Sequence, residues 1–175
     1  MGWLSDLLKY GFTAEQRAAS RASERYVQTL EAYERELASL PQAEARAAAE
    51  RVLASSRFVR AAPRHDAPPG HTELAPALRE FFDRFHRLEV PEGELCADIA
   101  ELPPLDWAPG YLCLGATGVE HTHLAIRPRD ESIYILADDV PIPERVESTF
   151  ATVYHWILWL ERKEELLAEP DPPVA

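Results

Sequence analysis

The segment Trp107–Leu136, WAPGYLCLGATGVEHTHLAIRPRDESIYIL, decides the fold because it is the part of the chain that is dense in strand-forming residues. Its apolar run Tyr111–Leu114 stops at a turn that has two glycines within four residues, which suits a hairpin. Val119–Ile126 then alternates in polarity, and a turn at Arg127–Asp130 precedes a third apolar run. The pattern predicts three antiparallel strands joined as a meander.

Helices are predicted before this meander. Thr13 and Gln16 form a capping motif, and apolar residues at spacings of three and four extend the first helix to about Ser39. Pro41 interrupts or restarts the helix, and an alanine-rich stripe runs through residues 42–60. Residues 1–60 are therefore interpreted as an N-terminal extension that folds as an antiparallel helical hairpin, with one kinked helix as the alternative.

A linker and a second folded unit follow. Residues 61–71 hold three prolines and a glycine, which is the composition of a linker. A helix is predicted from a cap at Thr72 to about Leu88, followed by a short strand near residues 95–99. After the meander we expect an acidic loop over residues 137–147 and a final helix capped by Ser148 or Thr149.

These elements define an α+β fold, with an antiparallel meander flanked by helices and preceded by the helical hairpin. The predicted α+β domain covers residues 72–168. The tail, residues 169–175, is too rich in proline to order itself.

Charge is distributed unevenly along the chain. Residues 1–60 carry nine basic and eight acidic side chains, net +1, whereas residues 61–175 carry nine basic and 22 acidic side chains, net −13. A surface of this sign repels nucleic acid, and its natural charged partner is a basic protein surface. The acidic excess also suits simple solubility.

Composition also bears on location. The chain shows no leader pattern and no apolar run near eighteen residues, so neither secretion nor a membrane span is expected. Its two cysteines, Cys96 and Cys113, fit a reducing compartment better than a disulfide framework. We therefore expect a cytoplasmic protein.

His121 and His123 are the best candidates for metal chemistry, since two imidazoles one residue apart on a strand share a face. A catalytic site needs a third ligand and a base, for which Cys113, His155 or Asp139 are the candidates. The glycine-rich phosphate loops and the G-x-S-x-G nucleophile motif are absent from the sequence. No cofactor and no catalytic residue are predicted, and the ordinary interpretation places both histidines on the solvent face or beneath a helix.

The order of elements over residues 72–168 resembles the SMI1/KNR4 (SUKH) superfamily. The resemblance is carried by the helix LAPALREFFDRFH, the strands YLCLG, HTHLAI and SIYIL, and a last helix opened by STF. It implies an α+β fold with a twisted antiparallel sheet, and in bacteria it implies an immunity protein that binds and neutralises a cognate toxin, often a nuclease or deaminase.

The main hypothesis is therefore an immunity protein, not an enzyme, that occludes the basic active-site surface of a toxin. Carboxylates between the strands are predicted to steer the partner: Glu101, Asp106, Glu120, Asp138 and Asp139. Trp107 and Tyr111 are predicted to anchor it. The alternatives are an adaptor that uses the N-terminal helices and a metal-dependent enzyme at His121 and His123.

Overall fold

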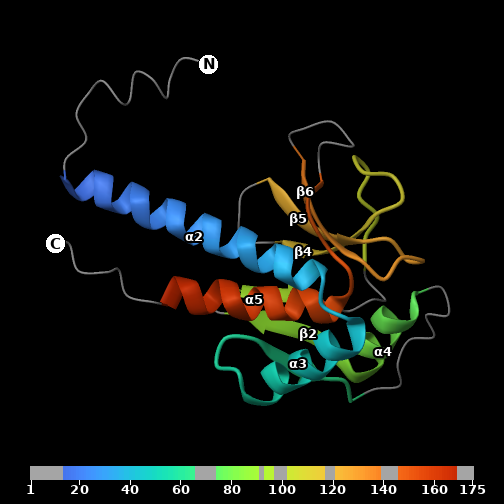
Figure 1. The fold of residues 1–175 in the computed structure, drawn as a ribbon. Helices are drawn as coiled ribbons and strands as arrows, with labels where there is room; N and C mark the ends of the chain where they lie inside the picture. Colours follow the sequence, from blue (N-terminus) through green and yellow to red (C-terminus); the bar gives the residue numbers. More distant parts are fainter. Residues whose placement is uncertain are drawn as a thin grey trace.

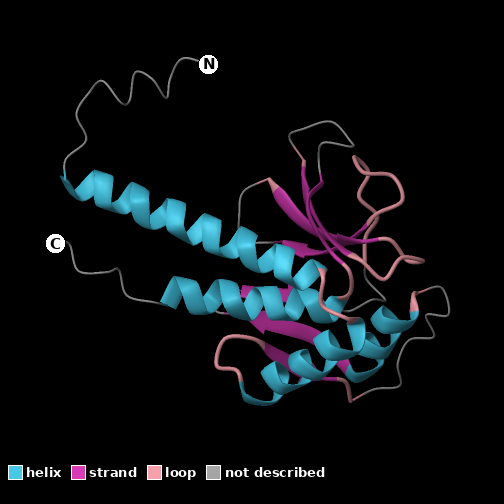
Figure 2. Ribbon diagram, in the orientation of Figure 1, coloured by secondary structure: helices cyan, strands magenta, loops and turns pink. Residues whose placement is uncertain are grey.

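The computed structural model describes residues 14–65, 74–90, 93–96, 102–116, 121–138 and 146–168, and it confirms the α+β class (Figures 1 and 2). Its elements are, in chain order, α2 (Ala14–Ala38), α3 (Gln42–Ser55), β1 (Arg60–Pro63), α4 (Pro76–Arg84), β2 (Phe85–Val90), β3 (Gly93–Cys96), β4 (Leu112–Ala116), β5 (Thr122–Ile126), β6 (Ile133–Ala137), β7 (Val146–Phe150) and α5 (Val153–Ala168). The strands form two antiparallel sheets, β1-β2-β3 and β4-β5-β6-β7.

The predicted meander is confirmed as β4, β5 and β6. Thr122 pairs with Ala137 and Ile126 with Ile133, so β5 and β6 are in regular antiparallel register. A bulge near Leu114 shifts the pairing of β4 with β5 between Cys113 and Gly115. This register brings the residues just outside the β5–β6 pairing, His121 and Asp138, to the same end of the sheet.

The prediction of an acidic loop up to residue 147 and a helix capped by Ser148 or Thr149 was wrong at this point, because residues 146–150 form a fourth strand of this sheet. Phe150 is buried and Val146 and Ser148 are half-buried, while Glu147 and Thr149 are exposed. A bulge in the pairing with β6 places Val146 against a second, smaller cluster and Phe150 in the main core. The side chain that meets the first turn of α5 is Thr152, whose hydroxyl oxygen accepts the N–H of Tyr154 at 3.2 Å.

The helix predicted from Thr72 to Leu88 is shorter than expected. It ends at Arg84, and Phe85 already has extended backbone angles of −127° and 145°. Residues 85–90 become β2, which pairs with β1 on one side and β3 on the other. Phe85 and Leu88 fit the helical spacing, but two ladders of backbone hydrogen bonds stabilise the strand instead. Thr72 lies outside the described residues.

The two predicted N-terminal helices are present, and Pro41 separates them as expected. Both lie against α5, with α2 along one side and α3 along another (Figure 1). Leu37 of α2 and Ala45 and Ala49 of α3 belong to the same buried core as the sheets. The beginning of the predicted linker, residues 61–63, is part of β1.

Ion pairs also connect α3 to α4 across the surface of this core. Arg46 pairs with Glu80, and Arg84 pairs with Glu50. The hydrogen bond from Arg84 lowers the pKa of Glu50. Because all four side chains are at least 38% exposed, these pairs add little stability. They show that α3 and α4 lie close together.

His155 of α5 joins the turn between α2 and α3 to the core. It is 2% exposed, and its two ring nitrogens lie 2.8 Å from the Thr152 hydroxyl and 3.0 Å from the Leu40 carbonyl oxygen. Both nitrogens therefore have partners, which a buried imidazole requires. Within the described residues, no helix is both long and apolar enough to cross a bilayer.

Truncating Leu37 to alanine is expected to lower the free energy of unfolding by about 2–5 kcal/mol, because this buried side chain joins α2 to the main core. Val27 on the same helix is 46% exposed, so Val27→Ala should change stability by less than about 0.5 kcal/mol. Urea unfolding followed by circular dichroism measures both. Equal effects of the two substitutions would show that α2 is not docked through Leu37.

Candidate functional site

The loop before β4 is hydrogen-bonded within itself and covers the second face of the meander. Its backbone closes on itself, with the N–H of Leu105 bonded to the Tyr111 carbonyl at 3.0 Å and the N–H of Tyr111 to the Ala108 carbonyl at 3.1 Å. Gly110 has a φ of +88°, which favours glycine. The loop and sheet share a small buried cluster: Leu105, Ala108, Tyr111, Ala125, Tyr134 and Leu136.

This cover places Trp107 beside the predicted histidines. Trp107 is half-buried, and its ring centroid lies 5.2 Å from that of His123 on β5. Asp106, the residue before it, is exposed. Two of the predicted partner-binding residues thus lie on a hydrogen-bonded loop next to the imidazole of His123.

His121 and His123 meet at the carboxylate of Asp138. The Nδ1 of His121 lies 2.9 Å from Oδ1 of Asp138, and the Nε2 of His123 lies 2.9 Å from Oδ2. The N–H of Asp138 also donates to the His121 carbonyl at 2.9 Å, which fixes the carboxylate beside the strand end. His121 has a φ of +63°, so the direction of its side chain is determined by the turn before β5 and not by the alternation of a strand. We name His121, His123 and Asp138 the histidine–aspartate cluster.

The two imidazoles hold Asp138 in its ionised form. The hydrogen bond from His123 lowers the pKa of Asp138 most, partial desolvation opposes the shift, and the hydrogen bond from His121 adds to the lowering. Each oxygen of the carboxylate receives a separate donor. The cluster therefore presents a carboxylate that stays charged to lower pH than an ordinary aspartate does.

The residues proposed to complete a metal site do not join these histidines. His155 uses both nitrogens in the core, and the Cys113 thiol lies 3.7 Å from the Gly115 carbonyl oxygen as a free cysteine. Within the described ranges, no three histidine, cysteine or acidic side chains are arranged to hold a metal ion. Asp139 lies outside the described residues.

The other predicted partner-binding residues divide into two groups. Tyr111 is 5% exposed and lies beneath the guanidinium of Arg127, so its ring belongs to the core and does not offer an anchor on the surface. Glu101 and Glu120 lie outside the described residues. Asp106, Trp107 and Asp138 are the predicted residues that the structure places around one site.

Sequence reasoning missed Asp138 as the shared partner of both histidines. The signal was present in the hairpin register, because pairing Thr122 with Ala137 places His121 opposite Asp138. It also missed the contacts of Arg127, which lies 4.4 Å from the ring centroid of Tyr111 and 5.6 Å from that of Tyr134.

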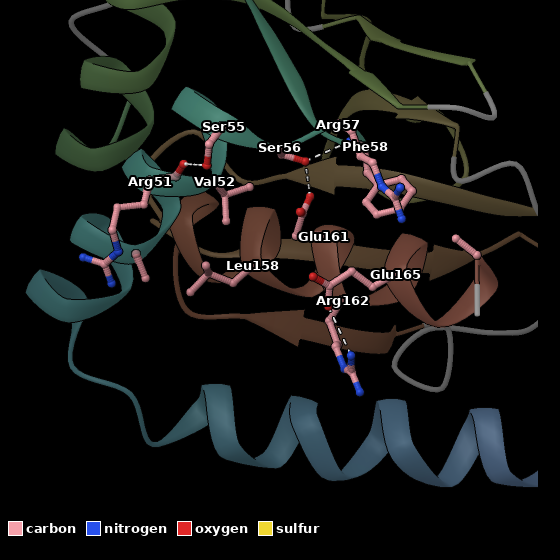
Figure 3. A pocket seen from close by; sticks show the side chains of 12 residues that line it. Arg51, Val52, Ser55, Ser56, Arg57, Phe58, Leu158, Glu161, Arg162 and Glu165 are labelled. Atoms are coloured by element: carbon pink, nitrogen blue, oxygen red, sulfur yellow. Dashed lines mark hydrogen bonds and ion pairs between the residues drawn. The ribbon is translucent and has the colours of Figure 1, made fainter. Parts of the chain in front are cut away.

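A separate open groove of about 920 Å³ lies between α3 and α5 (Figure 3). The Ser56 hydroxyl donates to Glu161 and accepts the N–H groups of Phe58 and Val59 at 2.9 Å, while Arg162 pairs with Glu165 at 3.1 Å. The carboxylates lining the groove are thus already engaged by neighbouring side chains. Its polar groups connect α3 to α5, and it lies apart from the residues of the histidine–aspartate cluster.

The chain matches no family model, no curated protein and no solved structure. The SUKH resemblance therefore stays a prediction.

Replacing His123 by alanine should raise the pKa of Asp138 toward the usual value of about 3.9, because the strongest hydrogen bond to its carboxylate is lost. A carbon-13 NMR titration of the carboxyl group measures this pKa. His65→Ala is the matched control, since His65 is exposed and makes no contribution to the Asp138 shift. An Asp138 pKa that is the same in the wild type and His123→Ala would contradict the cluster.

The sign of the accompanying stability change follows from this lowered pKa. The two hydrogen bonds favour the folded state above the pKa of the unfolded chain, and their contribution is lost as pH falls through the folded pKa. The usual carboxyl pKa places this effect near and below about pH 4. In that range, the stability of His123→Ala should depend less on pH than that of the wild type.

Tyr134 should titrate unusually late. Burial, followed by its hydrogen bond to Asp130, raises the pKa of Tyr134 to about 12. Because the unfolded chain releases this proton near its usual pKa of 10.0, stability should fall as pH rises from about 10 toward 12. Ultraviolet difference titration should show a tyrosine that ionises near pH 12 and is lost in Tyr134→Phe; ionisation of Tyr134 near pH 10 in the folded protein would refute the assignment.

Proposed function

We propose that this protein binds a basic protein toxin and neutralises it by covering its active-site surface, as the SUKH resemblance implies. The proposal is carried by one arrangement: the half-buried Trp107 lies against His123, the ionised Asp138 is bonded to His123, and the exposed Asp106 directly precedes Trp107 in the loop. We name Asp106, Trp107 and Asp138 the acidic–aromatic surface. It combines charge that attracts a basic partner with an aromatic side chain that suits an anchor.

The net charge of the chain supports the same partner chemistry. Residues 61–175 carry a net charge of −13, which raises the rate of encounter with a cationic surface. An enzyme that cleaves or deaminates nucleic acid has a cationic groove to hold phosphates. A protein that occupies this groove blocks the substrate without performing chemistry on it.

The packing of the N-terminal helices favours this function over that of a two-part adaptor. Leu37, Ala45 and Ala49 share one core with Phe81 and Ile126 of the following elements. A recruiting helical arm would not need to fill the core of the domain that it serves. Deleting residues 1–60 would therefore expose this core, and surface substitutions are the better test of each region.

The histidine–aspartate cluster also bears on the metal-dependent alternative. Its imidazoles direct one nitrogen each to Asp138, at 2.9 Å, and the groove between α3 and α5 involves none of these residues. The metal-dependent alternative keeps a direct test. Stoichiometric zinc or iron in the purified protein, lost in a His121→Ala/His123→Ala double variant, would favour that alternative over the binding function.

The steering test needs a basic toxin that the protein binds, to be sought in the neighbouring reading frame, and compares two variants that each lose four negative charges. The site variant is Asp106→Asn, Glu120→Gln, Asp138→Asn and Asp139→Asn. The control variant removes exposed charges on α2 and α4: Glu24→Gln, Glu31→Gln, Glu36→Gln and Asp83→Asn. At low salt the site variant should associate about tenfold more slowly than the wild type, with a weaker salt dependence.

The control variant should keep most of the association rate, because its charges lie on other elements. Stopped-flow fluorescence across a series of salt concentrations measures both rates. If both variants associate equally slowly, the effect comes from net charge alone and not from this surface. An unchanged rate in the site variant would exclude steering by this surface.

A further inference from the structure

The sheet already holds one arginine on aromatic rings beside a carboxylate. The guanidinium carbon of Arg127 lies 4.4 Å from the ring centroid of Tyr111 and 5.6 Å from that of Tyr134. Tyr134 donates a hydrogen bond to Asp130, and the charge of Arg127 helps to keep Asp130 ionised. An aromatic face next to a carboxylate is the environment that a guanidinium favours.

The acidic–aromatic surface also has an aromatic ring and a carboxylate, and imidazoles take the place of the guanidinium. The Trp107 ring lies against His123, and Asp138 receives one ring nitrogen at each oxygen. Two separate N–H donors to the two oxygens of one carboxylate reproduce the pattern of a bidentate arginine. A lysine ammonium, as a point charge, does not match both oxygens in this way.

We propose that Asp138 and Trp107 form a receptor for an arginine side chain of the partner, and that His121 holds the carboxylate in position until the guanidinium replaces it. This inference rests on the proposed function, because it names the chemistry by which the partner is recognised. The guanidinium forms hydrogen bonds with Asp138 and lies near the indole of Trp107.

The exposure of the two histidines decides which of them moves. The His121 side chain is 57% exposed, whereas that of His123 is 29% exposed and lies against Trp107. His121 can therefore turn toward solvent more readily than His123, which stays on Oδ2. Because each oxygen of an ionised carboxylate can accept two hydrogen bonds, a bidentate guanidinium can take the place of His121 on Oδ1 and share Oδ2 with His123. Asp138 itself is 30% exposed at its side chain, so its carboxylate is accessible to an incoming donor.

The experiment titrates the full chain with two blocked peptides, acetyl-(Gly-Arg)₃-amide and acetyl-(Gly-Lys)₃-amide, and follows the side-chain NMR signals of His121, His123 and Trp107. The arginine peptide should bind about fivefold more tightly than the lysine peptide. Asp138→Asn should weaken binding of the arginine peptide about tenfold, and Trp107→Leu about two- to fivefold.

His121→Ala separates this receptor from a merely acidic surface. It should tighten binding of the arginine peptide about twofold or more, because a competing donor to Asp138 has been removed. Asp83→Asn on α4 is the control with the same loss of charge at an exposed position, and it should leave the affinity unchanged.

Equal affinities for the two peptides, or an arginine affinity that Asp138→Asn leaves unchanged, would overturn the receptor. So would the absence of any binding of the arginine peptide at low salt. These results would leave the proposed function standing, because that function is tested by binding of the toxin and not of the peptides. If the Asp138→Asn variant binds the toxin with full affinity, the arginine receptor is refuted and the immunity function is retained.

Discussion

The burial of the first two turns of α5 is the constraint on which the rest of the structure depends. Residues 153–158 are all buried, so this part of the helix needs neighbours on every side. α2 and α3 pack along it, α4 and β7 contact it, and Leu124 and Ile126 of the sheet join the same core. His155, with a partner for each nitrogen, fixes the turn between α2 and α3 to this helix.

This arrangement leaves the second face of the meander to carry the site. One face of β5 and β6 is committed to the core around α5, while the other is covered by the loop that holds Leu105 and Tyr111. The end of the β5–β6 pair, where His121 and Asp138 meet, lies beside that loop. Side chains on a paired strand and a hydrogen-bonded loop keep their positions, which suits recognition of a specific partner.

The sequence was informative where the spacing of apolar residues agreed with the positions of turn-forming and helix-breaking residues. The three strands of the meander, the break at Pro41 and the α+β class all follow from local pattern. The edge strand at residues 146–150 was missed because Ser148 and Thr149 also suit a helix cap, and only pairing with β6 distinguishes the two. β2 was missed because Phe85 and Leu88 extend the helical stripe of α4, and the strand is stabilised by non-local hydrogen bonds.

The site followed the same division between local and long-range information. Asp106, Trp107 and Asp138 were predicted from residue type and position in loops, but their proximity to His121 and His123 depends on strand register. Tyr111 was misread because an aromatic residue at a strand start gives no indication that Arg127 and the loop enclose it. Residue type thus indicated the chemistry, and the tertiary pairing decided which residues meet.

Hydrogen–deuterium exchange of the full chain, alone and with a basic toxin of the proposed kind that it binds, tests the central claim most directly. If the acidic–aromatic surface binds the toxin, residues 102–111 and the ends of β5 and β6 around His121 and Asp138 become protected, while α2 and α3 exchange as in the free protein. Protection confined to α2 and α3, or no protection at any segment under conditions where the toxin is neutralised, would contradict it.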